Sequence, residues 1–186
     1  MSMSSNMPST RSYLSRLVRQ RSLFIGAAIA VIVALGAVAW YLFRPERAFV
    51  NQTVNERFPM SAARSPVPAE TGAKVLASGM FHKVAKETKG TATVYQLASG
   101  KEVLRLTGFE TANGPDLHVY LVAARDALDT DTVKQVDHVE LGLLKGNIGD
   151  QNYDIPEGTD LSKYQAVSIW CNRFSVNFGT APLATK

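Results

Sequence analysis

The chain has 186 residues, with 20 lysines and arginines against 16 aspartates and glutamates, and a formal net charge of +4. Residues 1–43 contain four arginines and no acidic residue, so residues 44–186 are neutral overall. Nucleic-acid binding by this larger part is disfavoured, because no basic excess remains to neutralise phosphates. A chain of this length provides one ordinary domain with appendages.

An apolar stretch without a formal charge, Ser22–Phe43, follows a basic N-terminal segment, residues 1–21. As a helix rising about 1.5 Å per residue, it would extend roughly 33 Å, which is enough for a hydrocarbon core of about 30 Å. Trp40 and Tyr41 stand near its end, where amphipathic rings suit the membrane interface. The sequence therefore predicts one transmembrane helix in contact with the lipid bilayer.

The distribution of arginines predicts the orientation of this span. Four arginines precede it, whereas Arg44 and Arg47 follow it with Glu46 between them. The positive-inside rule then places the N-terminus in the cytoplasm and the C-terminal domain on the extracytoplasmic side of the cell membrane. A cleaved signal peptide is the alternative, since Ala37-Val38-Ala39 resembles a cleavage site. The apolar run is longer than a usual signal core, which favours a retained anchor.

Residues 44–72 contain four prolines and show little periodicity, which predicts a linker between the span and the domain. Within this segment, Val54–Pro59 is compatible with docking on the domain or the membrane. A plain linker is the favoured interpretation of the whole segment.

Residues 73–183 are typical of β-structure, because short apolar runs alternate with turn signals. Strands are predicted at Lys74–Phe81, Thr91–Leu97, Glu102–Thr107, Leu117–Val122 and Val139–Leu144, in an extended segment before Pro156, and twice within Tyr164–Gly179. Seven or eight short strands at this spacing predict an all-β domain, an antiparallel β-sandwich or a barrel-like fold.

The strand at Leu117–Val122 shows the clearest alternation. Leu117, Val119 and Leu121 share one face, which we expect to point into the core. His118 and Tyr120 share the other face, for which solvent exposure is expected. The polar stretch Asp126–Val136 that follows is expected to be a surface loop or a short helix.

The last two predicted strands contain the only cysteine of the chain, Cys171. Val167, Ile169 and Cys171 alternate onto one face, and Phe174, Val176 and Phe178 are expected to continue the apolar alternation. An exported domain with one cysteine cannot form an internal disulfide. Three alternatives remain open for this thiol: packing in the core, redox or cofactor chemistry, and a disulfide between two chains.

No familiar catalytic or metal-binding motif is present in the sequence. The three histidines lie too far apart for a local metal motif. The glycine-rich segment Gly142–Tyr153 matches neither a phosphate-binding loop nor an EF-hand, so a structural hairpin is favoured. No metal site is predicted, and whether the protein is an enzyme stays open.

Three blocks of the sequence together resemble the electron-transfer DM-13 domain family. They are GFETANGPDLHVYL (Gly108–Leu121), LGLLKGNIGDQNYDIP (Leu141–Pro156) and YQAVSIWCNRFSVNFGTAPL (Tyr164–Leu183). The resemblance covers residues 73–183, and bacterial members that consist of an anchor, a linker and one such domain are similar to the whole chain.

The resemblance implies a β-rich extracytoplasmic domain with a role in electron transfer. It also implies that Cys171 is the redox residue, acting as a free thiol or by holding a prosthetic group such as haem. The partner would be a redox or envelope protein. The competing hypothesis is a non-enzymatic envelope module that binds a partner, with Cys171 as a structural core residue.

Overall fold

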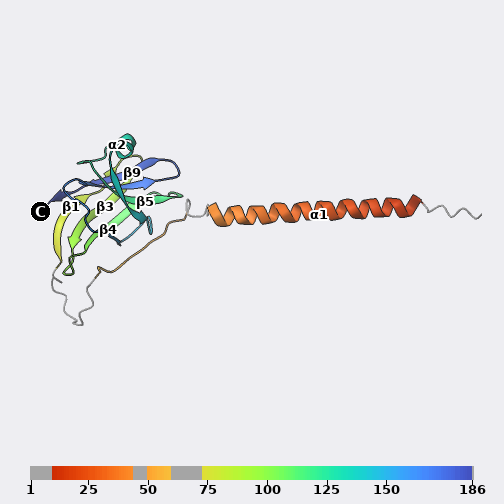
Figure 1. Ribbon diagram of the computed structural model, residues 1–186, viewed down its shortest axis with the longest axis horizontal. Coiled ribbons are helices and arrows are strands. Elements are labelled where there is room, and N and C mark those ends of the chain that lie inside the picture. The colour runs from red at the N-terminus through yellow and green to blue at the C-terminus, as the bar shows by residue number, and fades with distance from the viewer. Residues whose placement is uncertain (1–9, 44–49, 60–72, 186) are drawn as a thin grey trace, which may run out of the picture. The chain divides into compact units, whose positions relative to one another are not determined.

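The computed structural model describes residues 10–43, 50–59 and 73–185 of the chain (Figure 1). The chain divides into two units, Met1–Pro45 and Glu46–Lys186. Parts of two predicted segments lie outside the described residues, namely residues 1–9 of the basic segment and residues 44–49 and 60–72 of the linker.

The first unit contains helix α1 (Thr10–Phe43), so the predicted span Ser22–Phe43 is helical. The described side chains of this helix, from Ile25 to Tyr41, are all exposed. A search of the residues that the structure describes finds no helix with an apolar stretch long enough to cross a bilayer.

The second unit is a β-sandwich of two five-stranded antiparallel sheets (Figure 1), and this confirms the all-β prediction. The first sheet has the order β10 (Ala184–Thr185), β1 (Lys74–Met80), β3 (Thr88–Gln96), β4 (Glu102–Thr111), β7 (Gln151–Asp154). The second sheet has the order β2 (His82–Lys83), β9 (Val176–Pro182), β8 (Ala166–Cys171), β5 (Leu117–Val122), β6 (His138–Leu143). One short helix, α2 (Thr130–Gln135), lies within the polar stretch for which a loop or short helix was expected.

Apolar side chains from the facing sides of the two sheets form the main core. Leu104 and Leu106 of β4 and Val119 and Leu121 of β5 are completely buried in it. The expected inward face of β5 is therefore confirmed. Packing of this kind stabilises the sandwich by removing apolar surface from water, at about 25 cal/mol per Å².

One expected member of the core lies outside it. The alternation was expected to include Phe174, but Phe174 falls in the turn between β8 and β9 and is 64% exposed. Ser175, the next residue, has a positive φ of 50°, and β9 begins only at Val176. The turn thus interrupts the alternation, and Phe174 is left on the surface.

Residues 50–59, which we call the strap, lie against the β-domain, so the favoured interpretation as a plain linker does not hold for Val54–Pro59. The backbone N–H of Val54 donates to the carbonyl of Ile148 at 2.9 Å. The N–H of Glu56 donates to the carbonyl of Asp150, also at 2.9 Å. These bonds dock the strap alongside the glycine-rich segment.

Charged and aromatic side chains hold the second half of the strap. The Lys145 ammonium donates to the Glu56 carboxylate at 2.8 Å. The Arg105 guanidinium donates to the Glu56 carbonyl at 3.2 Å and lies 5.9 Å from the centre of the Phe58 ring. Phe58 also packs edge-on against Tyr95, with ring centres 4.8 Å apart. These contacts give Val54–Pro59 a fixed place that a free linker lacks.

We expect Gly149→Ala to release the strap. Gly149 has a φ of +102°, and a Cβ there would lie 2.0 Å from the Val54 carbonyl oxygen. Gly100, with a φ of +85° and nothing within 4 Å, provides the control substitution Gly100→Ala. Both changes strain the backbone by about 1–3 kcal/mol, and only Gly149→Ala should also speed tryptic cleavage at Arg57. Equal cleavage rates in the two variants would contradict this prediction.

Acid should loosen the strap as well. Burial alone would raise the pKa of Glu56, but hydrogen bonds from Lys145 and Asn152 outweigh it, and the pKa is lowered from 4.5. A group with a lowered folded pKa stabilises the fold above its unfolded pKa and loses this contribution as pH falls through the folded pKa. Because Glu56 is 32% exposed, the contribution is below about 1 kcal/mol.

Hydrogen exchange at the Val54 and Glu56 amides, corrected for chemical exchange rates, measures this loosening between about pH 6 and about pH 3.5. Protection should fall with pH in the wild type and stay level in Glu56→Gln. A parallel fall in both proteins would assign the effect to other carboxylates.

Candidate functional site

The candidate site begins at Cys171, the last residue of β8. The residue pairs with Leu117 of β5 on one side and with Val176 of β9 on the other. Its side chain points into the core between the sheets together with Val167 and Ile169, as the alternation predicts. Cys171 has no exposed surface and is a free thiol.

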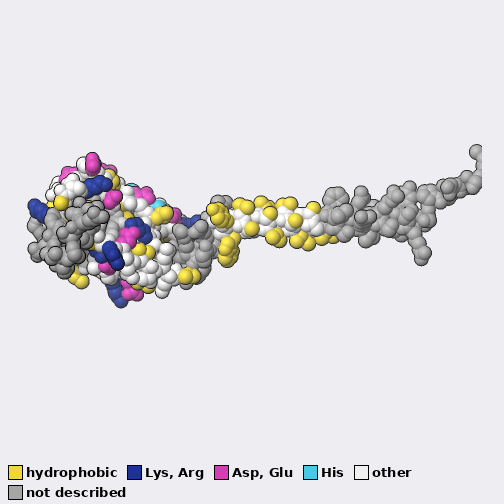
Figure 2. Space-filling model, turned by 90° about the horizontal axis from the view of Figure 1, so that it is seen from below, with side chains coloured by type: hydrophobic (Ala, Val, Ile, Leu, Met, Phe, Trp, Pro, Cys, Tyr) yellow, Lys and Arg dark blue, Asp and Glu magenta, His cyan; other side chains and the backbone are white. Residues whose placement is uncertain are grey.

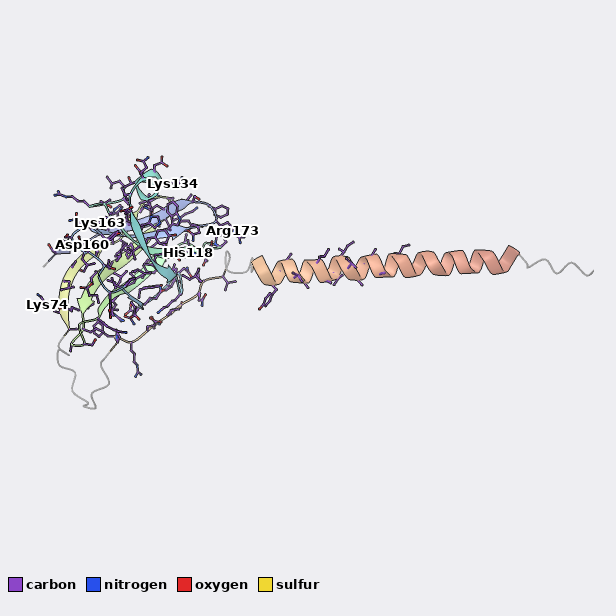
Figure 3. The ribbon with its side chains drawn as sticks, in the orientation of Figure 1. Lys74, His118, Lys134, Asp160, Lys163 and Arg173 are labelled. Atoms are coloured by element: carbon purple, nitrogen blue, oxygen red, sulfur yellow. The ribbon has the colours of Figure 1, made fainter. Side chains whose placement is uncertain are left out.

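This position limits the chemistry open to Cys171. The reactive form of a cysteine is the thiolate, which requires an accessible and electropositive environment. Cys171 is enclosed by apolar side chains, whereas Arg173 lies in the exposed turn beyond it (Figure 3). Of the three alternatives, core packing matches the observed place of the thiol. A disulfide between two chains requires Sγ to reach the surface, and a redox role stays a prediction.

The folded domain has no room for haem at Cys171. A haem ligand must present its sulfur to a cavity that holds the macrocycle, and this sulfur is enclosed by the core. Within the described parts of the chain, no three His, Cys, Asp or Glu side chains are grouped so as to hold a metal ion. The surroundings of Cys171 therefore do not fit the possible haem.

The opposite face of the second sheet carries an aromatic cluster directly behind Cys171. Trp170, the neighbour of Cys171, points outward and stacks on Tyr120 with ring centres 6.3 Å apart. Tyr120 in turn stacks on His138 at 4.7 Å with an angle of 6° between the rings. We call Trp170, Tyr120, His138 and the adjacent His118 the outer cluster.

The expected solvent exposure of His118 and Tyr120 is wrong, since they are only 9% and 5% exposed. The segment from Ala123 to Asp137, including α2, covers this face of the sheet. Ala127 and Val133 of this segment pack in one apolar group with Tyr120 and Trp170. The sequence did contain an indication that this outward face is covered, because Val122 and Ala166 on the same face are apolar.

Carboxylates surround His118, one of the two histidines of the outer cluster. His118 Nδ1 lies 2.6 Å from the Glu140 carboxylate, and Nε2 lies 3.0 Å from that of Asp116. Both ring nitrogens of His118 therefore have a carboxylate partner. Figure 3 shows His118 at the same end of the domain as Arg173.

Tyr120 is held as a neutral phenol within this cluster. Its hydroxyl donates a hydrogen bond to the Asn172 side-chain oxygen at 2.8 Å. Burial, followed by the negative charge of Glu140, raises the pKa of Tyr120. Among the described side chains, no buried polar atom lacks a hydrogen-bond partner. The cluster therefore has its hydrogen bonds satisfied internally.

The third histidine, His82, is separate from both groups. His82 Nε2 lies 2.9 Å from the Asp126 carboxylate, at the beginning of the covering segment. Burial alone would lower the pKa of His82, but the hydrogen bond with Asp126 outweighs it and the pKa is raised. A site that joins a histidine to Cys171 is not formed, since His118 and Cys171 lie on opposite faces of the sheet.

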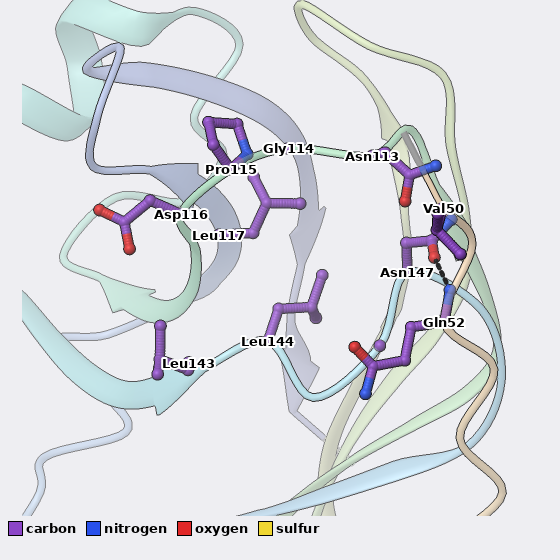
Figure 4. A pocket seen from close by; sticks show the side chains of 11 residues that line it. Val50, Gln52, Asn113, Gly114, Pro115, Asp116, Leu117, Leu143, Leu144 and Asn147 are labelled. Atoms are coloured by element: carbon purple, nitrogen blue, oxygen red, sulfur yellow. Dashed lines mark hydrogen bonds between the residues drawn. The ribbon is translucent and has the colours of Figure 1, made fainter. Parts of the chain in front are cut away.

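The surface of the domain has two clefts. The smaller, of about 70 Å³, is shown in Figure 4. Its lining comes from the turn at residues 113–117, from residues 143–147 and from the strap residues Val50 and Gln52. The larger cleft, of about 450 Å³, lies between residues 100–102 and 154–159. Cys171 lines neither cleft.

The prediction of a hairpin for the glycine-rich segment is wrong, because the flanking strands β6 and β7 belong to different sheets and do not pair with each other. The segment connects the two sheets. The completely buried side chain of Gln151 accepts hydrogen bonds from the backbone N–H groups of Lys145 and Gly146, each at 3.1 Å. Its amide group donates to the Gly146 carbonyl at 2.8 Å. These bonds shape the surface on which the strap lies.

A comparison with protein families matches residues 80–183 to the family described as Electron transfer DM13. The chain belongs to the DM13 electron-transfer family. Searches of curated proteins and of solved structures gave no match. The matched range lies within the predicted range of 73–183 and includes both Cys171 and the outer cluster. Membership indicates a redox-related role for this DM13 domain.

Substitution of Cys171 tests how the thiol is packed in the DM13 domain. Cys171→Ala removes one buried sulfur and should lower the free energy of unfolding by about 1–2 kcal/mol. Cys171→Ser should cost about 1–3 kcal/mol more if its buried hydroxyl finds no partner. Urea unfolding measures both values. Losses near zero for both variants would contradict the buried position.

Proposed function

We propose that the protein is a membrane-anchored, extracytoplasmic DM13 domain that takes part in electron transfer through Cys171. Membership of the DM13 family is the observation that carries the proposal. The presence of a single cysteine within the matched range supports the choice of this residue.

The anchor is supported by the composition and the surface of α1. Ser22–Phe43 has no formally charged residue, and Figure 2 shows apolar side chains along the described part of this helix. A helix that is hydrophobic all round is buried in a large core or in a membrane. The arginine distribution then supports a cytoplasmic N-terminus and an extracytoplasmic DM13 domain.

A redox role for Cys171 requires the end of β8 to open. The turn from Asn172 to Ser175 is exposed, and it is joined to the next loop by a hydrogen bond from the Asn172 N–H to the Asp116 carbonyl, at 2.9 Å. Cys171 is the last residue of the strand, so separation of this turn exposes Sγ without unfolding the rest of β8. Partial opening of this kind costs less than global unfolding.

A second candidate function is a non-enzymatic envelope module in which Cys171 is structural. The complete burial of the thiol favours it. In this case the domain acts by binding a redox or envelope protein, and the cysteine contributes only to packing. The two candidates differ in whether Sγ becomes accessible in the native protein.

The decisive experiment measures the reaction of Cys171 with a thiol reagent in the intact protein at increasing urea concentrations. Reaction through a local opening should depend weakly on urea and proceed faster than global unfolding allows. The control is a thiol in the middle of the same strand, Ile169→Cys combined with Cys171→Ala, which should react only through global unfolding.

Equal urea dependence for the two thiols would favour the structural role. An absorption spectrum of the protein as isolated completes the test, and we expect no haem bands because the surroundings of Cys171 do not fit haem. A spectrum with haem bands that disappear in Cys171→Ala would require a rearranged core.

A further inference from the structure

The strap reaches the β-domain at one particular end of the sandwich. The Gln52 N–H donates to the Asn147 side-chain oxygen at 2.7 Å, and Asn51 accepts a hydrogen bond from Asn113 at the same distance. Asn113 begins the turn that leads to Asp116, which bonds to the β8–β9 turn through Asn172. We call this end, with the turns 113–116 and 172–175, the strap-entry end.

Exposed apolar side chains gather at the strap-entry end. Among the described residues of the strap and the β-domain, five large apolar side chains are exposed, and three of them belong to this end. They are Val50 (62%), Leu143 (54%) and Phe174 (64%). Val50 and Leu143 line the same small cleft (Figure 4), and Phe174 lies in the turn bonded to Asp116, which also lines it. The sandwich therefore has one end with a preference for apolar surroundings.

The short connection between α1 and the strap limits how far the strap-entry end can lie from the end of the helix. Helix α1 ends at Phe43, and Asn51 is already bonded to the domain. The eight residue steps between them extend at most about 29 Å. If Ser22–Phe43 spans the bilayer, the strap-entry end stays within this distance of the membrane surface.

We propose that the strap-entry end docks on the lipid bilayer, with Phe174, Leu143 and Val50 entering the interfacial region. The proposal rests on the proposed membrane anchor. An exposed aromatic side chain next to a basic one, here Phe174 beside Arg173, suits the level of the lipid headgroups. Docking covers the apolar side chains, which otherwise remain in water. It also directs the end of β8 that carries Cys171 towards the membrane.

Fluorescence quenching in lipid nanodiscs tests this docking. The full-length protein carries one fluorophore, attached either at Phe174→Cys or at Lys74→Cys, in a Cys171→Ala background. Lys74 is exposed and lies at the other end of the domain in Figure 3. The discs contain phosphatidylcholine and phosphatidylglycerol, with a fraction of the lipid carrying a nitroxide near the headgroup. We expect the fluorophore at position 174 to be quenched several-fold more strongly than that at position 74.

The quenching and the elution of the protein together distinguish failure of the docking proposal from failure of the membrane anchor. Equal and weak quenching in a protein that co-migrates with the discs would overturn the docking and leave the anchor intact. A protein that elutes without lipid would overturn the anchor and the docking together.

A longer connection distinguishes a docked surface from simple proximity. Twelve glycine and serine residues are inserted after Glu46, which lengthens the connection without changing the apolar side chains. Strong quenching at position 174 should persist, because contact with lipid holds the end in place. Loss of quenching in the lengthened protein would overturn the docking surface. Quenching that stays equally strong when Leu143→Ser is added to the lengthened protein would overturn it as well.

Discussion

The second sheet is covered on both of its faces, and the arrangement of the candidate site depends on this constraint. Every residue of its two adjacent strands, β5 and β8, is buried. The first sheet covers one face, and the segment Ala123–Asp137 covers the other. The N–H of Ala123 donates to the Asp137 carbonyl at 2.8 Å, which closes this segment into a cap. Cys171 on one face, and Tyr120 and Trp170 on the other, are consequently buried on opposite sides of one sheet, whereas His138 of the outer cluster is exposed.

Polar side chains fix the cap in place. Asn177 of β9 is completely buried and donates hydrogen bonds to the Ala127 carbonyl at 3.0 Å and to the Thr180 hydroxyl at 2.8 Å. Its side-chain oxygen accepts from the Ser168 hydroxyl at 2.9 Å. A buried polar group that loses its partner costs about 1–3 kcal/mol. The cap is thus tied to the strands beneath it, where it covers Tyr120 and Trp170.

Most of the β-domain could be predicted from alternation and turn residues. The inward faces of β5 and β8 follow directly from the period of two, because one face of each strand must meet the opposite sheet. The outer face of β5 was predicted incorrectly, since His118 and Tyr120 are polar and the pattern of one strand does not show what lies above it. Burial of these two residues depends on the cap, whose place over the sheet is fixed by hydrogen bonds from Asn177 and Thr180 of β9, which are distant from it in sequence.

The docking of the strap on the β-domain could not be predicted from the sequence for a related reason. Its residues show no strand periodicity, and each contact is made with a partner that is distant in sequence, from Tyr95 for Phe58 to Asn147 for Gln52. A local pattern can predict a strand that packs by its own alternation. It cannot predict a segment whose place is determined by single hydrogen bonds and one ion pair, of which Glu56 with Lys145 is the clearest.

Burial and redox chemistry at Cys171 are compatible only because of where the residue lies along its strand. A thiol at Ile169 would have strand residues on both sides, and its exposure would require β8 to leave the sheet. Cys171 instead adjoins an exposed turn, in which Asn172 is held by its backbone hydrogen bond to Asp116 and by the side-chain hydrogen bond from Tyr120. The same turn carries the exposed Phe174, so any event that engages this side chain acts directly on the turn. Under the proposed redox role, access to the thiol would therefore be controlled at the β8–β9 turn, while the rest of the sandwich keeps the thiol buried.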